Sequence, residues 1–334
     1  MNLPQYWSKI KSVKAAVKET RKLAQENDQA KPEMQKRFDY ITDRIRIYNK
    51  PNSDLSIIPD KSVQNICSSP PYYKMRPAQE DIVADEEIGR EATLELYIQA
   101  LVTSFGRCKR VMTEDGTCWV NLMDVVRDGC YQLVPEKFMA AMVDDGWICS
   151  DKLYWVKTNG QPGDGDNSFQ NVEYLMKFSL CQNPYTDYTW LNETSDFKGN
   201  SFGKGPGIKL ASFVNLKQGF VTTSGANTSR LREACEKEGF YLDHTSTYPL
   251  EIPYVCIKLS SKKGSHLLDI FSGTSTTAKA SLYAEMGLTY HGFEINKFSV
   301  RASKVNIEMD FEKQPCDNTI PFIPNQDIEA KQAA

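Results

Sequence analysis

Two short segments of the chain carry side chains in patterns that could do chemistry. The first is Ser69-Pro70-Pro71-Tyr72, directly after the apolar stretch 62–68. Proline lacks an N–H donor and fixes φ, so the two prolines hold a rigid loop whose carbonyl groups point outward as acceptors. The serine hydroxyl can also accept a hydrogen bond, and the tyrosine ring can stack on a planar group. These properties suit an exocyclic amino group on a flat heterocycle.

The second segment is a glycine-containing turn between a strand pattern and a helix pattern. A strand pattern runs through Asp269, Gly273 follows among small hydroxyl residues, and the next strand pattern ends at Glu294. A small residue lets the backbone approach a ligand, and the start of a helix offers free N–H groups. A carboxylate about 20 residues later can accept both hydroxyls of a ribose. The segment indicates a nucleoside-cofactor site, although a glycine after a strand is also typical of a plain βα turn.

Alternating patterns predict the elements that must position these segments. From residue 44 onward, short β-rich runs alternate with apolar residues at helical spacing. The predicted strands are 44–48, 62–68, 117–123, 148–157, 173–180, 266–271 and 289–295, and the predicted helices are 90–112, 132–145, 251–260, 275–287 and 297–308. This alternation predicts an α/β fold with a doubly wound, mainly parallel sheet. Both segments then lie at the carboxyl edge of one sheet, where such folds bind ligands.

The same patterns divide the chain into five regions. We predict a helical N-terminal extension over residues 1–43 and one α/β domain formed by halves 44–181 and 241–312. Between the halves lies an insertion, 182–240, rich in Gly, Asn, Ser and Thr, and a polar tail, 313–334, follows the domain.

Composition narrows the class of protein. The 334 residues are 40% hydrophobic and 25% charged, as in ordinary globular proteins. We find no apolar run long enough for a membrane span and no signal-peptide pattern, so we predict a cytoplasmic protein without membrane association. Nine cysteines without a C-x-x-C pair, and only three histidines, indicate neither a metal site nor a disulfide framework. The net charge of −3 averages over basic segments at 1–50 and 196–237, which favour local anion contacts.

Together the two segments resemble the motifs of the DNA amino-methyltransferases, which use S-adenosylmethionine to methylate an exocyclic nitrogen of cytosine or adenine. Their catalytic motif, [DNS]-P-P-[YFW], matches residues 69–72, and their cofactor motif, D-x-F-x-G-[ST]-x-T-T, matches 269–277. The catalytic motif comes first here, as in the permuted β group. The resemblance implies the Rossmann-like fold of S-adenosylmethionine-dependent methyltransferases, with an inserted target-recognition region and an N-terminal helical extension.

Further family-like segments lie in the expected order across about residues 44–308. Trp155, Lys157 and Asn159 match a W-x-K-x-N run, and residues 244–249 match an H-x-x-x-[FY]-P segment that closes over the methionine end of the cofactor. The resemblance implies cofactor contacts by His244, Thr245, Tyr248, Pro249, Asp269, Phe271, Ser272, Gly273, Thr274, Ser275, Thr276, Thr277 and Glu294.

Two places in the sequence depart from the family pattern. Asn49-Lys50 stands where a Gly-Asp pair is usual, so we assign no cofactor contact there. Ser275 stands where glycine is common in the cofactor turn, a position at which family members vary.

The resemblance also implies a mechanism for the residues of the catalytic motif. The Ser69 hydroxyl and the Pro70 carbonyl would accept the amino hydrogens and free the nitrogen lone pair for attack on the sulfonium methyl, while Tyr72 stacks on a base flipped out of the duplex. No covalent intermediate is needed, so we expect Cys67 to pack in a strand. Serine at the first motif position favours N4-cytosine. N6-adenine, a catalytically silent DNA-binding relative and an RNA or protein amino-methyltransferase stay open.

The insertion is the expected reader of double-stranded DNA. Its candidate backbone contacts are Lys198, Lys204, Lys209, Lys217, Arg230 and Arg232. The sequence decides neither a homodimer, which the N-terminal helices could form, nor a companion restriction endonuclease.

Overall fold

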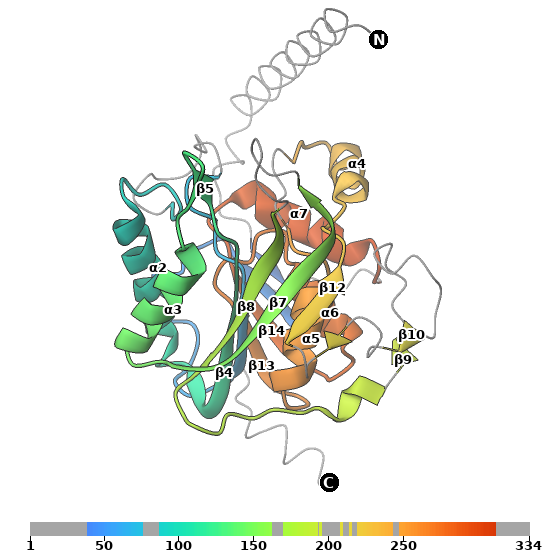
Figure 1. Ribbon diagram of the computed structural model, residues 1–334. Coiled ribbons are helices and arrows are strands. Elements are labelled where there is room, and N and C mark those ends of the chain that lie inside the picture. Colours follow the sequence, from blue (N-terminus) through green and yellow to red (C-terminus); the bar gives the residue numbers. More distant parts are fainter. Residues whose placement is uncertain are drawn as a thin grey trace, which may run out of the picture.

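The computed structural model of the chain describes residues 39–75, 87–161, 170–192, 194–195, 208–209, 214–215, 219–242 and 247–311. Its centre is a ten-stranded sheet (Figure 1). In spatial order the strands are β1 (Tyr40–Ile41), β2 (Ile45–Tyr48), β14 (Thr289–Phe293), β13 (His266–Asp269), β3 (Val63–Ser68), β4 (Met112–Leu122), β8 (Gln170–Ser179), β7 (Ile148–Gln161), β12 (Phe220–Thr223) and β11 (Val214–Asn215).

Helices and two small ribbons complete the described structure. The helices are α2 (Leu94–Cys108), α3 (Val134–Asp144), α4 (Ser229–Lys237), α5 (Glu251–Ser260), α6 (Thr276–Tyr283) and α7 (Lys297–Glu308), with a 3₁₀ turn at Thr189–Asn192. Two-stranded ribbons pair β5 (Val126–Arg127) with β6 (Cys130–Tyr131) and β9 (Thr194–Ser195) with β10 (Ile208–Lys209). No described helix is long and apolar enough to cross a membrane.

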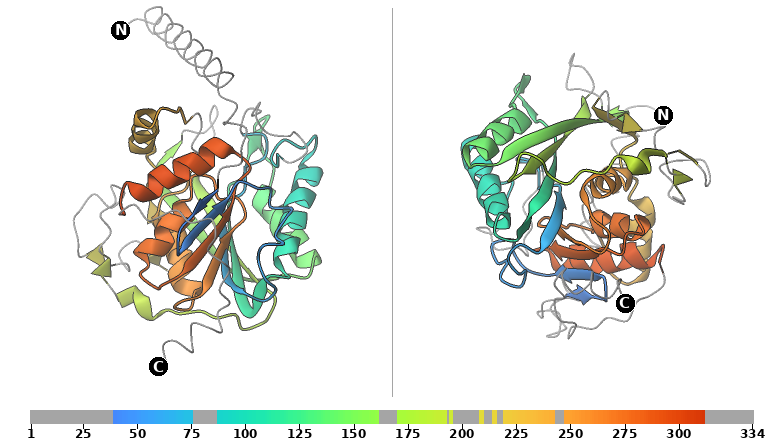
Figure 2. Two further views of the ribbon diagram at one scale, coloured as in Figure 1. Left: turned by 180° about the vertical axis from the view of Figure 1, so that it is seen from behind. Right: turned by 90° about the horizontal axis from the view of Figure 1, so that it is seen from below.

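Apolar packing explains why helices cover both faces of the sheet (Figure 2). On one face, α2 and α3 bury side chains against β3 and β4. On the other, α5 packs against β3 and β4, α6 against β14, and α7 against β1. The first core includes Ile66, Leu101, Phe105, Val120, Phe138 and Met142, and the second includes Val255, Ile257, Leu267, Ala280, Tyr290 and Val300. Each large buried side chain stabilises the fold by about 1.5–3 kcal/mol.

The predicted fold class, a doubly wound α/β sheet, is confirmed. Five of the nine strand pairings in the described sheet are parallel, and β8, β1 and β11 supply the antiparallel ones. Element bounds differ in places. The helix predicted over 90–112 is shorter, because Thr93 caps its start by accepting a hydrogen bond from the Leu96 N–H and the chain enters β4 at Met112.

The described part of the predicted insertion contributes to the main fold. Strand β12 pairs in parallel with β7 at the sheet edge. Helix α4 packs against α7, where Leu231 and Cys235 form a small core with Phe240, Leu242 and Ala302. Most of the predicted extension at 1–43 and all of the tail at 313–334 lie outside the described residues, so the domain boundaries stay predictions.

Strand order brings the two chemical segments together. β3 ends at the Ser69–Tyr72 loop and β13 ends at the glycine turn, and these two strands are parallel neighbours. From β3 the chain proceeds through α2 to β4 on one side, and from β13 through α6 to β14 on the other. The segments therefore meet at the topological switch point of the sheet.

Candidate active site

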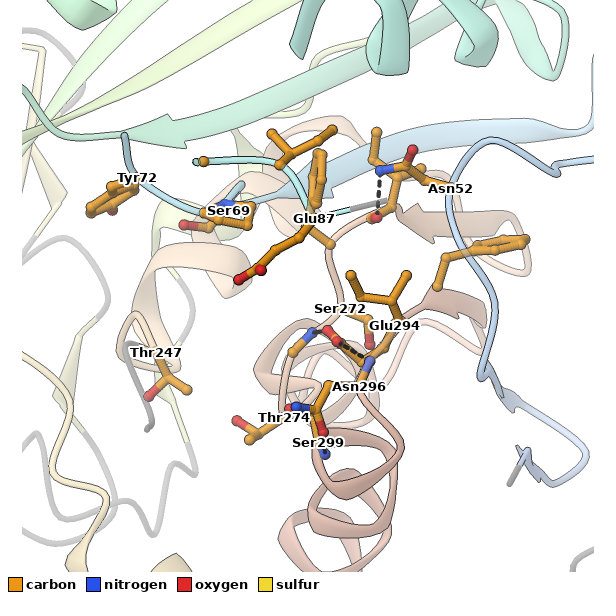
Figure 3. A pocket seen from close by; sticks show the side chains of 18 of the residues that line it. Asn52, Ser69, Tyr72, Glu87, Thr247, Ser272, Thr274, Glu294, Asn296 and Ser299 are labelled. Atoms are coloured by element: carbon orange, nitrogen blue, oxygen red, sulfur yellow. Dashed lines mark hydrogen bonds between the residues drawn. The ribbon is translucent and has the colours of Figure 1, made fainter. Parts of the chain in front are cut away.

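A cavity opens at the carboxyl ends of β3, β13 and β14 (Figure 3). In this view Ser69 and Tyr72 lie at one side, Thr274 and Glu294 at the other, and Glu87 between them. The predicted residues that line the cavity are Ser69, Pro71, Tyr72, Tyr248, Phe271, Ser272, Gly273, Thr274, Thr276 and Glu294. Pro70, Pro249, Asp269, Ser275 and Thr277 are not part of the lining, and His244 and Thr245 lie outside the described residues.

The glycine turn is shaped by left-handed backbone. Gly273 has φ of +52° and Ser275 has φ of +56°, a region that glycine adopts without strain. This conformation explains why glycine is common at the Ser275 position. Here the Ser275 N–H donates to the Ser272 carbonyl at 2.7 Å, and the two hydroxyl oxygens lie 2.6 Å apart. These bonds hold the turn closed at the start of α6.

Glu294 is tied to this turn from the end of β14. One carboxylate oxygen accepts the Gly273 N–H at 2.8 Å, and the other accepts the Asn296 N–H at 2.8 Å. A carboxylate has about four acceptor positions, and these two bonds fix the orientation of the group. Its place in the cavity wall suits a ribose.

Asp269 lies behind the turn rather than in the cavity. Its side chain is 1% exposed. One oxygen accepts from the Ser68 hydroxyl at 2.5 Å and the Phe271 N–H at 3.1 Å, and the other accepts from the Thr277 hydroxyl at 2.7 Å. Burial raises the pKa of Asp269 to about 6. Asp269 therefore joins β13 to β3 and links the two chemical segments.

The Ser69–Tyr72 loop is braced by residues from the following helix and its approach. The Tyr97 hydroxyl donates to the Pro71 carbonyl at 2.8 Å. Gly89 has φ of +104°, and an added Cβ there would lie 3.2 Å from Pro71 Cβ. The Lys74 N–H also donates to the Gly89 carbonyl at 2.7 Å. Glycine is therefore required where this segment touches the loop.

Hydrogen bonds orient the two polar side chains of the loop. The Ser69 hydroxyl donates to Asn121 Oδ1 of β4 at 3.3 Å. Because its hydrogen points to Asn121, the serine oxygen presents lone pairs elsewhere, including toward the cavity that it lines. The Tyr72 hydroxyl donates to Glu173 of β8 at 2.5 Å. Burial and the Glu173 carboxylate raise the pKa of Tyr72 well above 10, so the phenol keeps its proton.

Several cavity residues were not anticipated from the sequence. They are Lys50, Asn52, Glu87, Ile88, Gly89, Arg90, Thr247, Ile270, Phe293, Ile295, Asn296 and Ser299. No cofactor contact was assigned near Asn49 and Lys50, yet Lys50 and Asn52 reach the cavity because β2 pairs with β14. The sequence does place polar residues directly after the predicted strand 44–48, and this position could have indicated that they reach the cavity.

Cys67, which we expected to pack in a strand, does not line the cavity. Cys67 is buried within β3, and a hydrogen bond with Cys256 together with burial raises the pKa of its thiol well above 9. Such a neutral thiol is a poor nucleophile. Among the described residues, no group of His, Cys, Asp and Glu could hold a metal ion.

The structure describes only part of the expected DNA-contacting set. Lys198, Lys204 and Lys217 lie outside the described residues, and Lys209 is in β10. Arg230 and Arg232 are in the first turn of α4. The Arg230 guanidinium lies 3.5 Å from the Asp310 carboxylate, so part of its charge is balanced within the chain.

Fold and cavity together define a Rossmann-like α/β protein whose nucleoside-type turn and acceptor loop share one site. A family model described as DNA methylase, which covers N6 and N4 methyltransferases, matches residues 63–305. The chain belongs to this family and is a DNA methyltransferase. The resemblance read from the sequence is thereby confirmed.

Individual relatives support the same assignment. The chain is 27% identical to the type II methyltransferase M.Cfr9I of Citrobacter freundii over 274 residues, which is 73% of this chain and 81% of the relative. It is 27% identical to M.XycI of Xanthomonas campestris pv. cyanopsidis over 72% of this chain and 79% of that one. The solved PvuII DNA methyltransferase (cytosine-N4-specific) matches in fold, with a TM-score of 0.64, 17% identity and coverage of 87% and 92%.

Proposed function

We propose that the protein transfers a methyl group from S-adenosylmethionine to the exocyclic N4 of a cytosine flipped out of double-stranded DNA. The observation that carries this proposal is the Ser69 hydroxyl. Its hydrogen is directed to Asn121, and its oxygen lines a cavity shared with the nucleoside-type turn. An acceptor in that place can bind an amino group beside a cofactor.

The cavity residues fit S-adenosylmethionine. Glu294 would hold the ribose through charge-assisted hydrogen bonds. Apolar side chains of Ile270, Phe293 and Ile295 offer walls for a flat adenine ring. Ser272 and Thr274 add hydroxyl groups near the turn. When bound, the cofactor supplies an activated methyl group on sulfur.

The loop residues prepare the target nitrogen. The amino lone pair of cytosine is delocalised into the ring, which makes the group a poor nucleophile. Ser69 Oγ and the Pro70 carbonyl would accept its hydrogens and favour a tetrahedral nitrogen, while Tyr72 stacks on the base. Because the base cannot reach this cavity inside a duplex, it must flip out. Cys67 takes no part.

Serine at the first position of the loop supports cytosine as the target. The second candidate is N6-adenine, because the matching family contains both N6 and N4 enzymes and the same acceptors could bind an adenine amino group. The likeness to the PvuII enzyme, at 17% identity, concerns the fold.

DNA recognition is assigned to region 182–240, with its lysines and arginines on the phosphate backbone. The relatives are named type II methyltransferases, which supports a companion restriction endonuclease. A homodimer through the N-terminal region is the proposed assembly.

The decisive test is product identification. Genomic DNA from cells expressing the protein, and from cells expressing its Ser69→Ala variant, is digested and its nucleosides analysed by mass spectrometry. We expect N4-methylcytosine with the unaltered protein only. N6-methyladenine would overturn the base assignment, and 5-methylcytosine would overturn the mechanism. Unmodified DNA, together with no methyl transfer by purified protein, would establish a catalytically silent relative.

A further inference from the structure

A buried ion pair lies directly behind the loop that carries Tyr72. Lys157 Nζ of β7 lies 2.6 Å from Glu173 Oε1 of β8, and the two side chains are only 14% and 5% exposed. The strands are antiparallel neighbours, with Trp155 opposite Glu173. Burying an ionised pair costs free energy unless its remaining hydrogen-bonding positions are satisfied.

The second oxygen of Glu173 is used by the site. Glu173 Oε2 accepts the Tyr72 hydroxyl at 2.5 Å. The Tyr72 oxygen also lies 3.2 Å from Asn121 Oδ1, the atom that accepts the Ser69 hydroxyl. A continuous set of contacts therefore runs from Lys157 through Glu173 to Tyr72, and ends beside the acceptor serine.

We propose that the Lys157–Glu173 ion pair positions Tyr72, holding the hydroxyl end of its ring in place so that the ring can lie against the target base. This inference rests on the proposed function, in which the ring stacks on the base. At the backbone end, the ring is held by the braced loop, where Tyr97 bonds the Pro71 carbonyl. At the far end, a bond to the hydroxyl keeps the tip of the ring from swinging about its first side-chain torsion. Glu173 supplies that bond, and Lys157 holds Glu173.

The sequence run that contains Lys157 gains a physical explanation from this arrangement. Trp155, Lys157 and Asn159 stand at alternate positions of β7. The Trp155 indole N–H donates to the Thr223 carbonyl at 3.2 Å, and Asn159 accepts the Gly225 N–H at 2.6 Å. These two residues fasten β7 to the chain around β12. Lys157, which lies between them in the sequence, contacts Glu173 instead.

A double-mutant cycle tests the proposal. Tyr72→Phe, Glu173→Gln and the double variant are compared by transfer of tritiated methyl groups from S-adenosylmethionine to unmethylated bacterial genomic DNA. We expect each single change to lower kcat about tenfold without altering KM for the cofactor. The double variant should be no worse than either single one, because both remove the same contact.

Matched variants separate positioning from stability. Lys157→Met should also lower kcat, Lys157→Arg should restore most of it, and Lys152→Met, an exposed lysine on the same strand, should leave it unchanged. If Glu173→Gln does not fold, Lys157→Met combined with Tyr72→Phe gives the same cycle.

The proposal is overturned if the losses multiply, if Tyr72→Phe alone is as active as the unaltered protein, or if the ion-pair variants lower only the melting temperature. An unaltered protein that transfers no methyl group to DNA would instead overturn the proposed function.

Discussion

The two sides of the cavity are built in different ways. On the cofactor side, the bonds that shape the glycine turn join residues close in sequence: Ser272 bonds Ser275, and Glu294 bonds Gly273 across 21 positions. On the target-base side, the Ser69–Tyr72 loop depends on Asn121, 52 positions from Ser69, and on Glu173, 101 positions from Tyr72.

The difference shows which of the two motifs is held in shape mainly by its own residues. The glycine turn needs its own backbone conformation and one neighbouring strand. The acceptor loop has a rigid backbone from its prolines, but its side chains take their orientation from β4 and β8. We therefore expect changes on one side of the cavity to leave the other side largely intact.

The largest effect is expected on the base side. Ser69→Ala removes a hydrogen-bond acceptor for the amino group and should lower methyl transfer about 10²- to 10³-fold. Cofactor affinity, measured by calorimetry, should not change. Ser56→Ala, an exposed serine, is the control. An equal loss of cofactor affinity in Ser69→Ala would show that the two sides are not independent.

The second prediction concerns a substitution on the cofactor side of the cavity. Glu294→Ala removes charge-assisted hydrogen bonds and should weaken S-adenosylmethionine binding by about 1.5–3 kcal/mol, with kcat at saturating cofactor much less affected. Titration calorimetry measures this, with Glu285→Ala as an exposed control. Unchanged affinity would remove the ribose assignment.

Asp269, which links the two sides of the cavity, should make the stability of the fold depend on pH. The pKa of Asp269 is raised to about 6 from an ordinary value of 3.8, so between these values the folded protein holds a proton that the unfolded chain releases. This contribution stabilises the fold at pH 4 and is lost as pH rises through 6, by linkage on the order of 3 kcal/mol.

Asp269→Asn should remove this contribution, because the amide does not ionise and Thr277 can reorient to accept from it. Relative to the variant, the unaltered protein should lose free energy of unfolding between pH 4.5 and 7, as measured by urea titration. A difference that is constant with pH would contradict the assignment of Asp269 to the protein interior.

The smallest effect is expected for Cys67→Ala. The thiol is buried in β3 and takes no part in the proposed mechanism, so methyl transfer should stay within about twofold, with about 1 kcal/mol of stability lost to the small cavity. A folded variant without activity would contradict the non-covalent mechanism.

The sequence by itself determined the fold class and the chemistry. Alternating periodicity gave the doubly wound sheet, and two compact motifs, at 69–72 and 269–277, indicated an amino-methyltransferase. These features are readable because proline, glycine and hydroxyl side chains act on their own backbone. Helix and strand ends were less accurate, because they were predicted from apolar spacing, which does not mark a cap such as Thr93.

Only the tertiary structure decided which other residues hold the side chains of the two motifs in place. Pairing of β3 with β13 joins Ser68 to Asp269 across 201 positions and turns an expected cofactor ligand into a buried link. Asn121 and Glu173 carry no motif, yet strand register places them behind the loop. Strand pairing depends on burial summed over the whole chain, so no local pattern could show which strands would become neighbours.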